Sequence, residues 1–140
     1  MNGEITFSII KPDAFGSGNT GPILAMIHEA GFEIVALKLL RMTSEQAKSF
    51  YAIHKDRPFY NDLVEFMISG PVIVMILRQE NAVDKFRKLI GATDPAKAEP
   101  GTVRKRFASS VQMNAVHGSD SDENALRESN FFFSEAERCL

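Results

Sequence analysis

The chain has 140 residues, of which 44% are hydrophobic and 24% charged, and its net charge is −2. These values are typical of a globular protein, so we expect one domain over residues 1–140 that needs neither disulfide nor structural metal. The charge excludes nucleic-acid binding through bulk positive charge. The longest apolar run, Pro71 to Leu77, is too short to cross a membrane. A single cysteine, Cys139, and an N-terminus without signal-peptide features favour a cytoplasmic protein.

The first two elements predicted are strands separated by a helix. Residues 4–10 alternate apolar and polar side chains, which is the period of a strand. A proline near the first helical position and a closing glycine predict a helix from Thr20 to Gly31. Residues 32–40, rich in isoleucine, valine and leucine, predict the second strand.

Two helices and a buried strand are predicted next. Thr43 and Gln46 have the spacing of a capping box, so a helix should run from there towards His54. Residues 59–68 predict a second short helix with apolar side chains inward. The continuous apolar run 72–77 predicts a strand buried on both faces.

The last third of the chain contains the least regular segment. Asn81 is a candidate cap for a helix that ends at Gly91. Residues 92–110 contain prolines and a glycine and show no period, so we expect an irregular excursion of the kind that is usually functional. Residues 111–116 predict a short last strand, and residues 119–129 a helix with an acidic first turn.

This order of elements predicts an α+β fold. Two βαβ units give a ferredoxin-like βαββαβ sandwich, with a four-stranded antiparallel sheet and an irregular excursion before the last strand. The pattern predicts helices on one sheet face. The other face, together with Phe131 to Phe133, should then form an interface between copies of the chain.

A glycine-rich segment matches a dinucleotide-binding pattern only superficially. Gly16, Gly18 and Gly21 have the G-x-G-x-x-G spacing and precede a helix. The pattern requires the glycines to follow the strand directly, but residues 11–15 intervene, and no acidic residue ends the next strand. We interpret these glycines as turn residues.

The segment 114–120 places a histidine between a strand and a helix. A lone histidine is more often a surface or capping residue, but three features favour a functional one. Gly118 removes bulk beside the ring of His117, the following helix start offers N–H groups to an anion, and Glu128 lies far enough along that helix to fix one ring nitrogen. A neutral imidazole then keeps a nucleophilic nitrogen.

With this segment, the chain resembles the nucleoside diphosphate kinase family. Residues 114–120, Asn-Ala-Val-His-Gly-Ser-Asp, are similar to the active-site signature of that family. Further segments earlier in the chain are also similar to the family and occur in the same order as in its members. They are Ile10-Lys11-Pro12-Asp13, His54-Lys55-Asp56-Arg57-Pro58-Phe59, Ser69-Gly70-Pro71-Val72, Thr93-Asp94-Pro95 and Pro100-Gly101-Thr102-Val103-Arg104, so that the similarity covers almost the whole chain. Each is weak alone, and together they are specific.

The resemblance implies roles for individual residues. His117 corresponds to the phosphorylated histidine, and Lys11 is implied in catalysis as well as in binding. The positions that hold phosphates and sugar are Lys11, Arg87, Thr93, Arg104 and Asn114. The base would stack on Phe59 beside Leu63. The residues that orient or assist the histidine are Tyr51, Ser119 and Glu128.

The resemblance also implies an activity and partners. The family transfers the γ-phosphate of a nucleoside triphosphate to a nucleoside diphosphate by a ping-pong mechanism, with broad base and sugar tolerance. Mg²⁺ would be carried mainly by the nucleotide phosphates, so no protein metal ligand is expected. A homo-hexamer or homo-tetramer built from dimers is implied, with no need for a membrane or nucleic acid. The short C-terminal segment after Phe133 is similar to that of bacterial members of the family.

Two other classes of function remain open from the residues alone. One is a non-catalytic ferredoxin-like module that binds nucleotides or small anions, which the presence of His117 disfavours. The other is a dinucleotide-dependent oxidoreductase, which rests only on the glycine-rich segment.

Overall fold

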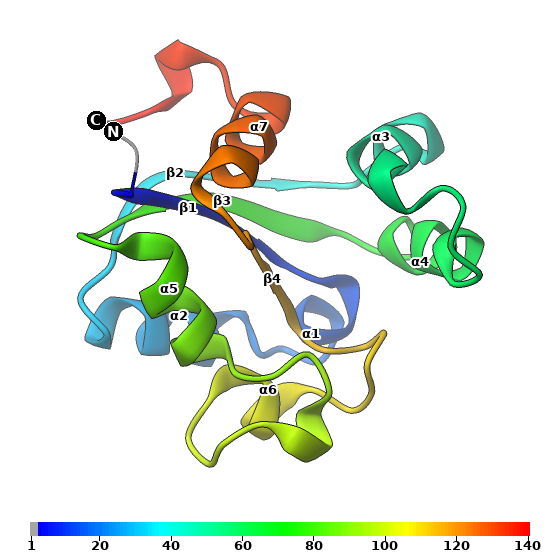
Figure 1. The fold of residues 1–140 in the computed structure, drawn as a ribbon, viewed down its shortest axis with the longest axis horizontal. Helices are drawn as coiled ribbons and strands as arrows, with labels where there is room; N and C mark the ends of the chain where they lie inside the picture. The colour runs from blue at the N-terminus through cyan, green and yellow to red at the C-terminus, as the bar shows by residue number, and fades with distance from the viewer. Residues whose placement is uncertain (1–2) are drawn as a thin grey trace.

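The computed structural model describes residues 3–140, and within them four strands form one antiparallel sheet in the order β2-β3-β1-β4 (Figure 1). The strands are β1 (Ile5–Ile10), β2 (Glu33–Leu40), β3 (Val72–Arg78) and β4 (Val116–Gly118). The α-helices are α1 (Pro12–Gly16), α2 (Thr20–Glu29), α3 (Ser44–Phe50), α4 (Tyr60–Met67), α5 (Ala82–Ile90), α6 (Val103–Phe107) and α7 (Asp122–Phe132). Single 3₁₀ turns are η1 (Ala52–His54), η2 (Pro95–Lys97) and η3 (Glu135–Glu137). The predicted α+β class and antiparallel sheet are confirmed.

Strand β1 lies between β3 and β4 and brings two distant parts of the chain together. Ile9 of β1 faces His117 of β4 in the strand register. Immediately beyond β1, the backbone N–H of Lys11 donates to the carbonyl of Ala115 at 2.9 Å. The end of β1 therefore fixes the segment that leads into β4.

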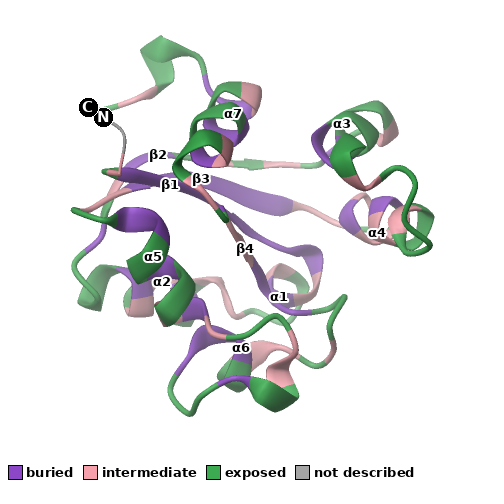
Figure 2. Cartoon of the chain, viewed as in Figure 1, coloured by how far each residue is buried: buried purple, intermediate pink, exposed green. Residues whose placement is uncertain are grey.

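Helices cover both faces of the sheet, contrary to the prediction of one covered face (Figures 1 and 2). Phe7 and Ile9 point into a core shared with α3, α4 and α7, whereas Ile10 points into a second core shared with α2 and α5. The ring of Phe132 stacks on that of Phe7 at 5.5 Å between centroids. Phe132 and Phe133 are buried in this core and Phe131 is half-buried against it, so residues 131–133 do not form the exposed aromatic surface that was expected.

Four elements lie where no regular element was predicted, namely α1, η2, α6 and η3, and the last strand is shorter than expected. Helix α1 follows β1 directly, and the excursion 92–110 contains η2 and α6. Strand β4 begins at Val116 rather than at residue 111. The cause is Ala115, whose φ of 73° is left-handed and breaks an extended strand.

Local capping was predicted correctly in one place and wrongly in another. Thr43 and Gln46 form the predicted capping box at the start of α3. Asn81 precedes α5 as predicted, but it is left-handed, with φ 55°, and makes no side-chain cap. The N–H of Ala82 instead donates to the carbonyl of Gly3 at 3.0 Å, so a tertiary contact replaces the cap. Among the described residues, no helix is long and apolar enough to span a membrane.

Candidate active site

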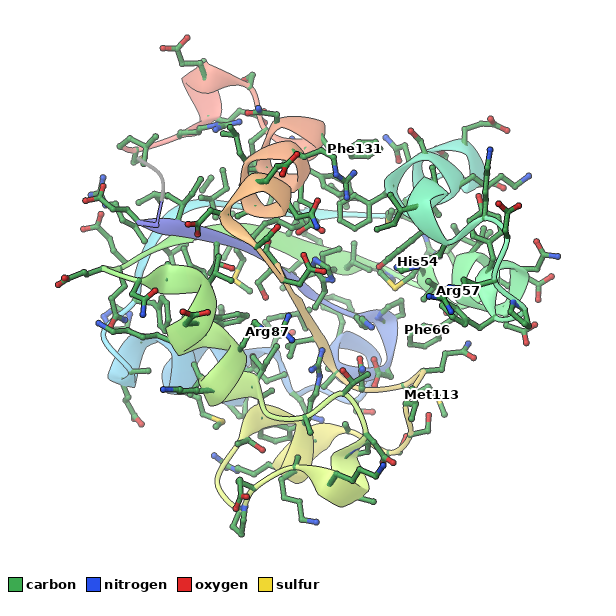
Figure 3. The ribbon with its side chains drawn as sticks, in the orientation of Figure 1. His54, Arg57, Phe66, Arg87, Met113 and Phe131 are labelled. Atoms are coloured by element: carbon green, nitrogen blue, oxygen red, sulfur yellow. The ribbon has the colours of Figure 1, made fainter. Side chains whose placement is uncertain are left out.

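One large cleft of about 1180 Å³ contains most of the residues singled out from the sequence. Its walls come from the end of β1, the α3–α4 region, the C-terminal end of α5, the excursion and the segment around β4. The predicted residues that line it are Lys11, Tyr51, Phe59, Leu63, Arg87, Thr93, Arg104, Asn114 and His117. Ser119 and Glu128 are not in its lining and lie buried behind His117. In Figure 3, Arg87 on α5 and His54 on the α3–α4 side are on opposite sides of β4.

The imidazole of His117 is held at one nitrogen. Its Nε2 lies 2.9 Å from Oε1 of Glu128, which is buried on α7. The Ser119 hydroxyl donates to the same oxygen at 2.7 Å and accepts the N–H of Phe7 at 3.1 Å. A carboxylate accepts hydrogen bonds, so the arrangement selects the tautomer with the proton on Nε2. Nδ1 is left with its lone pair and has no hydrogen-bond partner within residues 3–140.

Two aromatic rings fix the plane of the imidazole. The centroid of Phe50 lies 5.7 Å from that of His117 at an interplanar angle of 75°, and Phe7 lies 6.1 Å away at 60°. Both rings belong to the core under α3 and α7. The histidine therefore stands on the well-packed part of the fold, which keeps its orientation fixed.

Lys11 is an almost fully buried cation, with 7% of its surface exposed. Its Nζ donates to Oδ1 of Asn114 at 2.8 Å, and the Asn114 amide donates to the carbonyl of Thr93 at 3.3 Å. Burial and then the charge of Arg104 lower the pKa of Lys11 to about 8, although Asp13 opposes this. No carboxylate within residues 3–140 forms a salt bridge with this ammonium, so an anionic ligand in the cleft would stabilise it.

Arg104 is positioned by backbone carbonyls. Its Nη1 donates to Gly91 at 3.0 Å and its Nη2 to Val116 at 2.9 Å. Burial, and then repulsion from Arg87, lower its pKa to about 10. Arg87 itself is exposed on α5 and faces the same cleft. Three cations thus converge from β1, α5 and α6, and their mutual repulsion favours binding of a multiply charged anion.

The hydroxyl of Tyr51 is buried at the cleft and, in the described chain, has no hydrogen-bond partner. Burial first, and the charge of Glu128 second, raise the pKa of this phenol well above its usual value. Tyr51 therefore stays protonated at neutral pH and can donate a hydrogen bond into the cleft.

The far end of the cleft is apolar and open. Phe59 is 47% exposed, and its ring packs against that of His54 at 5.5 Å between centroids. Leu63 and the exposed Val111 line the same end. Such a surface can take the flat face of an aromatic ring.

Sequence reasoning missed several residues that line the cleft. They are Lys88, Ile90, Gly91, Ala92, Lys97, Glu99, Val111 and Gln112, whereas His54 and Thr102 were noticed only within the segments similar to the family. Val111 was missed because it was assigned to the strand predicted over residues 111–116. Asp120 was noticed only as part of the signature segment, and it also lines the cleft. Its pKa is lowered, chiefly by a hydrogen bond from the side chain of Asn124.

The structure changes the interpretation of two features beside the histidine. A Cβ on Gly118 would lie 2.9 Å from side-chain atoms of both Phe86 and Ile90, so this glycine allows α5 to pack on β4. The first turn of α7 carries Asp122 and Glu123, which are unsuited to an anion. Positive charge in the cleft therefore comes from side chains. The glycines of the G-x-G-x-x-G segment are absent from the lining of the cleft.

Comparison with known proteins agrees with this geometry. A family model described as nucleoside diphosphate kinase matches residues 4–138. The nucleoside diphosphate kinase of Rhizorhabdus wittichii is 57% identical over 133 residues, 95% of each chain. Among solved structures, the Aquifex aeolicus nucleoside diphosphate kinase has a TM-score of 0.94 at 44% identity, with 96% of this chain and 98% of that chain covered. A Halobacterium salinarum nucleoside diphosphate kinase in complex with CDP has a TM-score of 0.92 at 37% identity, with 98% and 91% covered.

The cleft combines an anchored histidine, three converging cations and an apolar end. The family model and the relatives named above match this chain over nearly its whole length. The chain therefore belongs to the nucleoside diphosphate kinase family of phosphotransferases.

Proposed function

We propose that the chain transfers the γ-phosphate of a nucleoside triphosphate to a nucleoside diphosphate through a phosphohistidine at His117. The observation that carries this proposal is the hydrogen bond from Nε2 to Glu128, which leaves Nδ1 as the nucleophilic nitrogen in a cationic cleft. Nδ1 attacks the γ-phosphorus, the N–P bond forms, and the bond to the β-phosphate oxygen breaks, releasing the diphosphate. A second diphosphate then attacks the phosphorus through its terminal oxygen and restores the imidazole.

The remaining residues position the nucleotide in this scheme. Lys11, Arg87 and Arg104 would hold the phosphate oxygens, where charge accumulates in the transition state. Thr93 and Asn114 would hold phosphate and sugar, and the base would stack on Phe59 beside Leu63. Tyr51 would donate a hydrogen bond from its hydroxyl to the transferring phosphoryl group or to the adjacent phosphate. Ser119 and Glu128 would orient the imidazole without touching the nucleotide. This division follows the burial of the last two residues.

Mg²⁺ would enter with the nucleotide phosphates. The acidic side chains in the cleft lining are Asp120 and Glu99, and residues 3–140 contain no group of three metal-binding side chains. Mg²⁺ keeps several waters and is commonly held by substrate phosphates with few protein ligands, so this lining fits a nucleotide-borne ion. When bound, it neutralises phosphate charge.

Initial-rate kinetics test the proposed mechanism. Because one site must serve donor and acceptor in turn, double-reciprocal plots at several fixed acceptor concentrations should be parallel lines, the pattern of a ping-pong mechanism. Intersecting lines would instead mean that donor and acceptor bind together, and the phosphohistidine scheme would be withdrawn.

Base and sugar should matter little to the rate. Stacking on Phe59 is indifferent to base identity, since every base has a π-face. We expect purine and pyrimidine nucleotides, with ribose or deoxyribose, to be donors and acceptors at saturating Mg²⁺. Catalytic efficiencies that differ by more than about a thousandfold, ~4 kcal/mol of transition-state free energy, would require a base-reading contact.

The proposed assembly is a homo-oligomer, a hexamer or a tetramer built from dimers. Helices cover both sheet faces in the described part of the chain, so the bare face that first suggested an assembly is not found there. However, β2 is one of the two edge strands of the sheet and presents Leu37 and Leu39 to solvent. An exposed apolar edge strand is suited to pairing with a second copy. A stable monomer in light scattering at micromolar concentration would contradict this assembly.

Domain organisation and location complete the proposal. Residues 1–140 should unfold as one domain, in a single calorimetric transition. The proposed location is the cytoplasm, so cell fractionation should recover the protein with the cytoplasm, and neither membrane nor nucleic acid should be needed for activity.

A further inference from the structure

Ala115 is held from both sides by one short segment at the end of β1. The N–H of Lys11 donates to its carbonyl at 2.9 Å, and the N–H of Ala115 donates to Oδ2 of Asp13 at 3.1 Å. Ala115 is fully buried. Both of its backbone groups are therefore satisfied by residues about a hundred positions earlier in the sequence.

The backbone that these bonds hold is strained. Ala115 has φ 73°, and the N–H of Val116 bonds to the carbonyl of Asn114 at 2.9 Å across it, which closes a γ-turn. A non-glycine residue in such a conformation costs about 1–3 kcal/mol and persists only where its surroundings impose it. The carboxylate of Asp13 supplies one of these constraints.

Parts of the active site depend directly on the turn. Asn114, before it, accepts the hydrogen bond from Nζ of Lys11, and the carbonyl of Val116, after it, accepts one from Arg104. His117 follows immediately. A relaxed turn would move the lysine, the arginine and the histidine relative to one another.

We propose that Asp13 is a positioning residue for phosphoryl transfer, which acts by locking the left-handed turn at Ala115 and so sets the distances among Lys11, Arg104 and His117. The proposal rests on the proposed phosphohistidine mechanism. Asp13 is absent from the lining of the cleft, so it acts through the turn rather than through contact with the nucleotide.

The charge of Asp13 has a second consequence, for Lys11. The charged groups that act on the Lys11 ammonium are Arg104 from α6, which lowers its pKa, and Asp13 from α1, which raises it; Asn114 contributes a neutral amide. Removing the Asp13 charge while keeping an acceptor oxygen should lower the pKa of Lys11 further. Two substitutions of Asp13 can therefore separate the effect of its hydrogen bond to Ala115 from the effect of its charge on the pKa of Lys11.

Asp13→Asn and Asp13→Ala are the two variants, compared with wild type and with Asp122→Ala, which removes an exposed first-turn aspartate of α7. Near pH 6.5, Asp13→Asn should keep kcat within about threefold, because its amide oxygen can still accept the N–H of Ala115. Asp13→Ala should lose about ten- to a hundredfold in kcat with a smaller change in KM, as expected for misplaced transition-state contacts. In Asp13→Asn, the alkaline limb of kcat/KM should move to lower pH.

A double variant keeps the test decisive if Asp13→Ala folds poorly. Glycine adopts a positive φ without the cost that alanine incurs, so Ala115→Gly should restore part of the lost kcat in the Asp13→Ala background. A well-folded Asp13→Ala enzyme with kcat within twofold of wild type would overturn the proposal, as would a double variant without recovery. If wild type forms no phosphohistidine, the mechanism itself fails; if wild type forms it and the Asp13 variants match wild type, only the role of Asp13 fails.

Discussion

Replacing His117 by alanine is expected to lower kcat by a factor on the order of 10⁴ or more, because the nucleophile itself is removed. Nucleotide binding should survive, since Lys11, Arg87 and Arg104 remain in the cleft. The variant should also fold. Glu128 loses the hydrogen bond from Nε2 but keeps the one from Ser119, so the free energy of unfolding should fall by only about 1–3 kcal/mol.

The matched control for this prediction is another histidine. His28 lies exposed on α2 and does not line the cleft. His28→Ala should leave kcat unchanged in the same assay. If His117→Ala retained kcat near that of wild type while binding nucleotide normally, phosphoryl transfer would have to use another nucleophile.

The second large effect is expected at Lys11. Lys11→Ala should lower kcat/KM about a hundredfold or more, because in the proposed mechanism this buried cation stabilises the charge that develops on the transferring phosphate. Lys85→Ala removes an exposed lysine of α5 outside the cleft and should have little effect. A folded Lys11→Ala enzyme with near-normal efficiency would remove this residue from the phosphate site.

The pH dependence of wild type gives an independent test of the same lysine. Its pKa in the free protein is about 8, so the ammonium is present below that pH and lost above it. The alkaline limb of kcat/KM should therefore fall through about pH 8, since this parameter reports the free enzyme. Bound phosphates favour the ammonium, so the limb of kcat should lie at higher pH. Lys11→Ala should lack both limbs.

The elements with strong local signals were predictable from the sequence. The capping box at Thr43 and the apolar run of β3 are confirmed because each depends on neighbouring residues. The motif around His117 also indicated the family, since its residue types occur together at fixed spacing.

The features that were missed depend on contacts between distant segments. The start of β4 was misplaced because Ala115 is held left-handed by Lys11 and Asp13, about a hundred residues away. The second covered face of the sheet was missed because α7 packs back on β1 through Phe132. Val111 looked like a strand residue, yet it lines the cleft. The hydrophobic pattern of a sequence does not distinguish an apolar residue of the core from an apolar residue that lines a binding cleft.

The most direct test of the account is capture of the phosphoenzyme. The protein is incubated with a γ-labelled nucleoside triphosphate and Mg²⁺, without an acceptor, beside His117→Ala and His28→Ala. The account predicts label on wild type and His28→Ala that survives base, is lost in acid and leaves when a nucleoside diphosphate is added, with no label on His117→Ala. Acid-stable label, label on His117→Ala, or full turnover by an enzyme that never becomes labelled would contradict it.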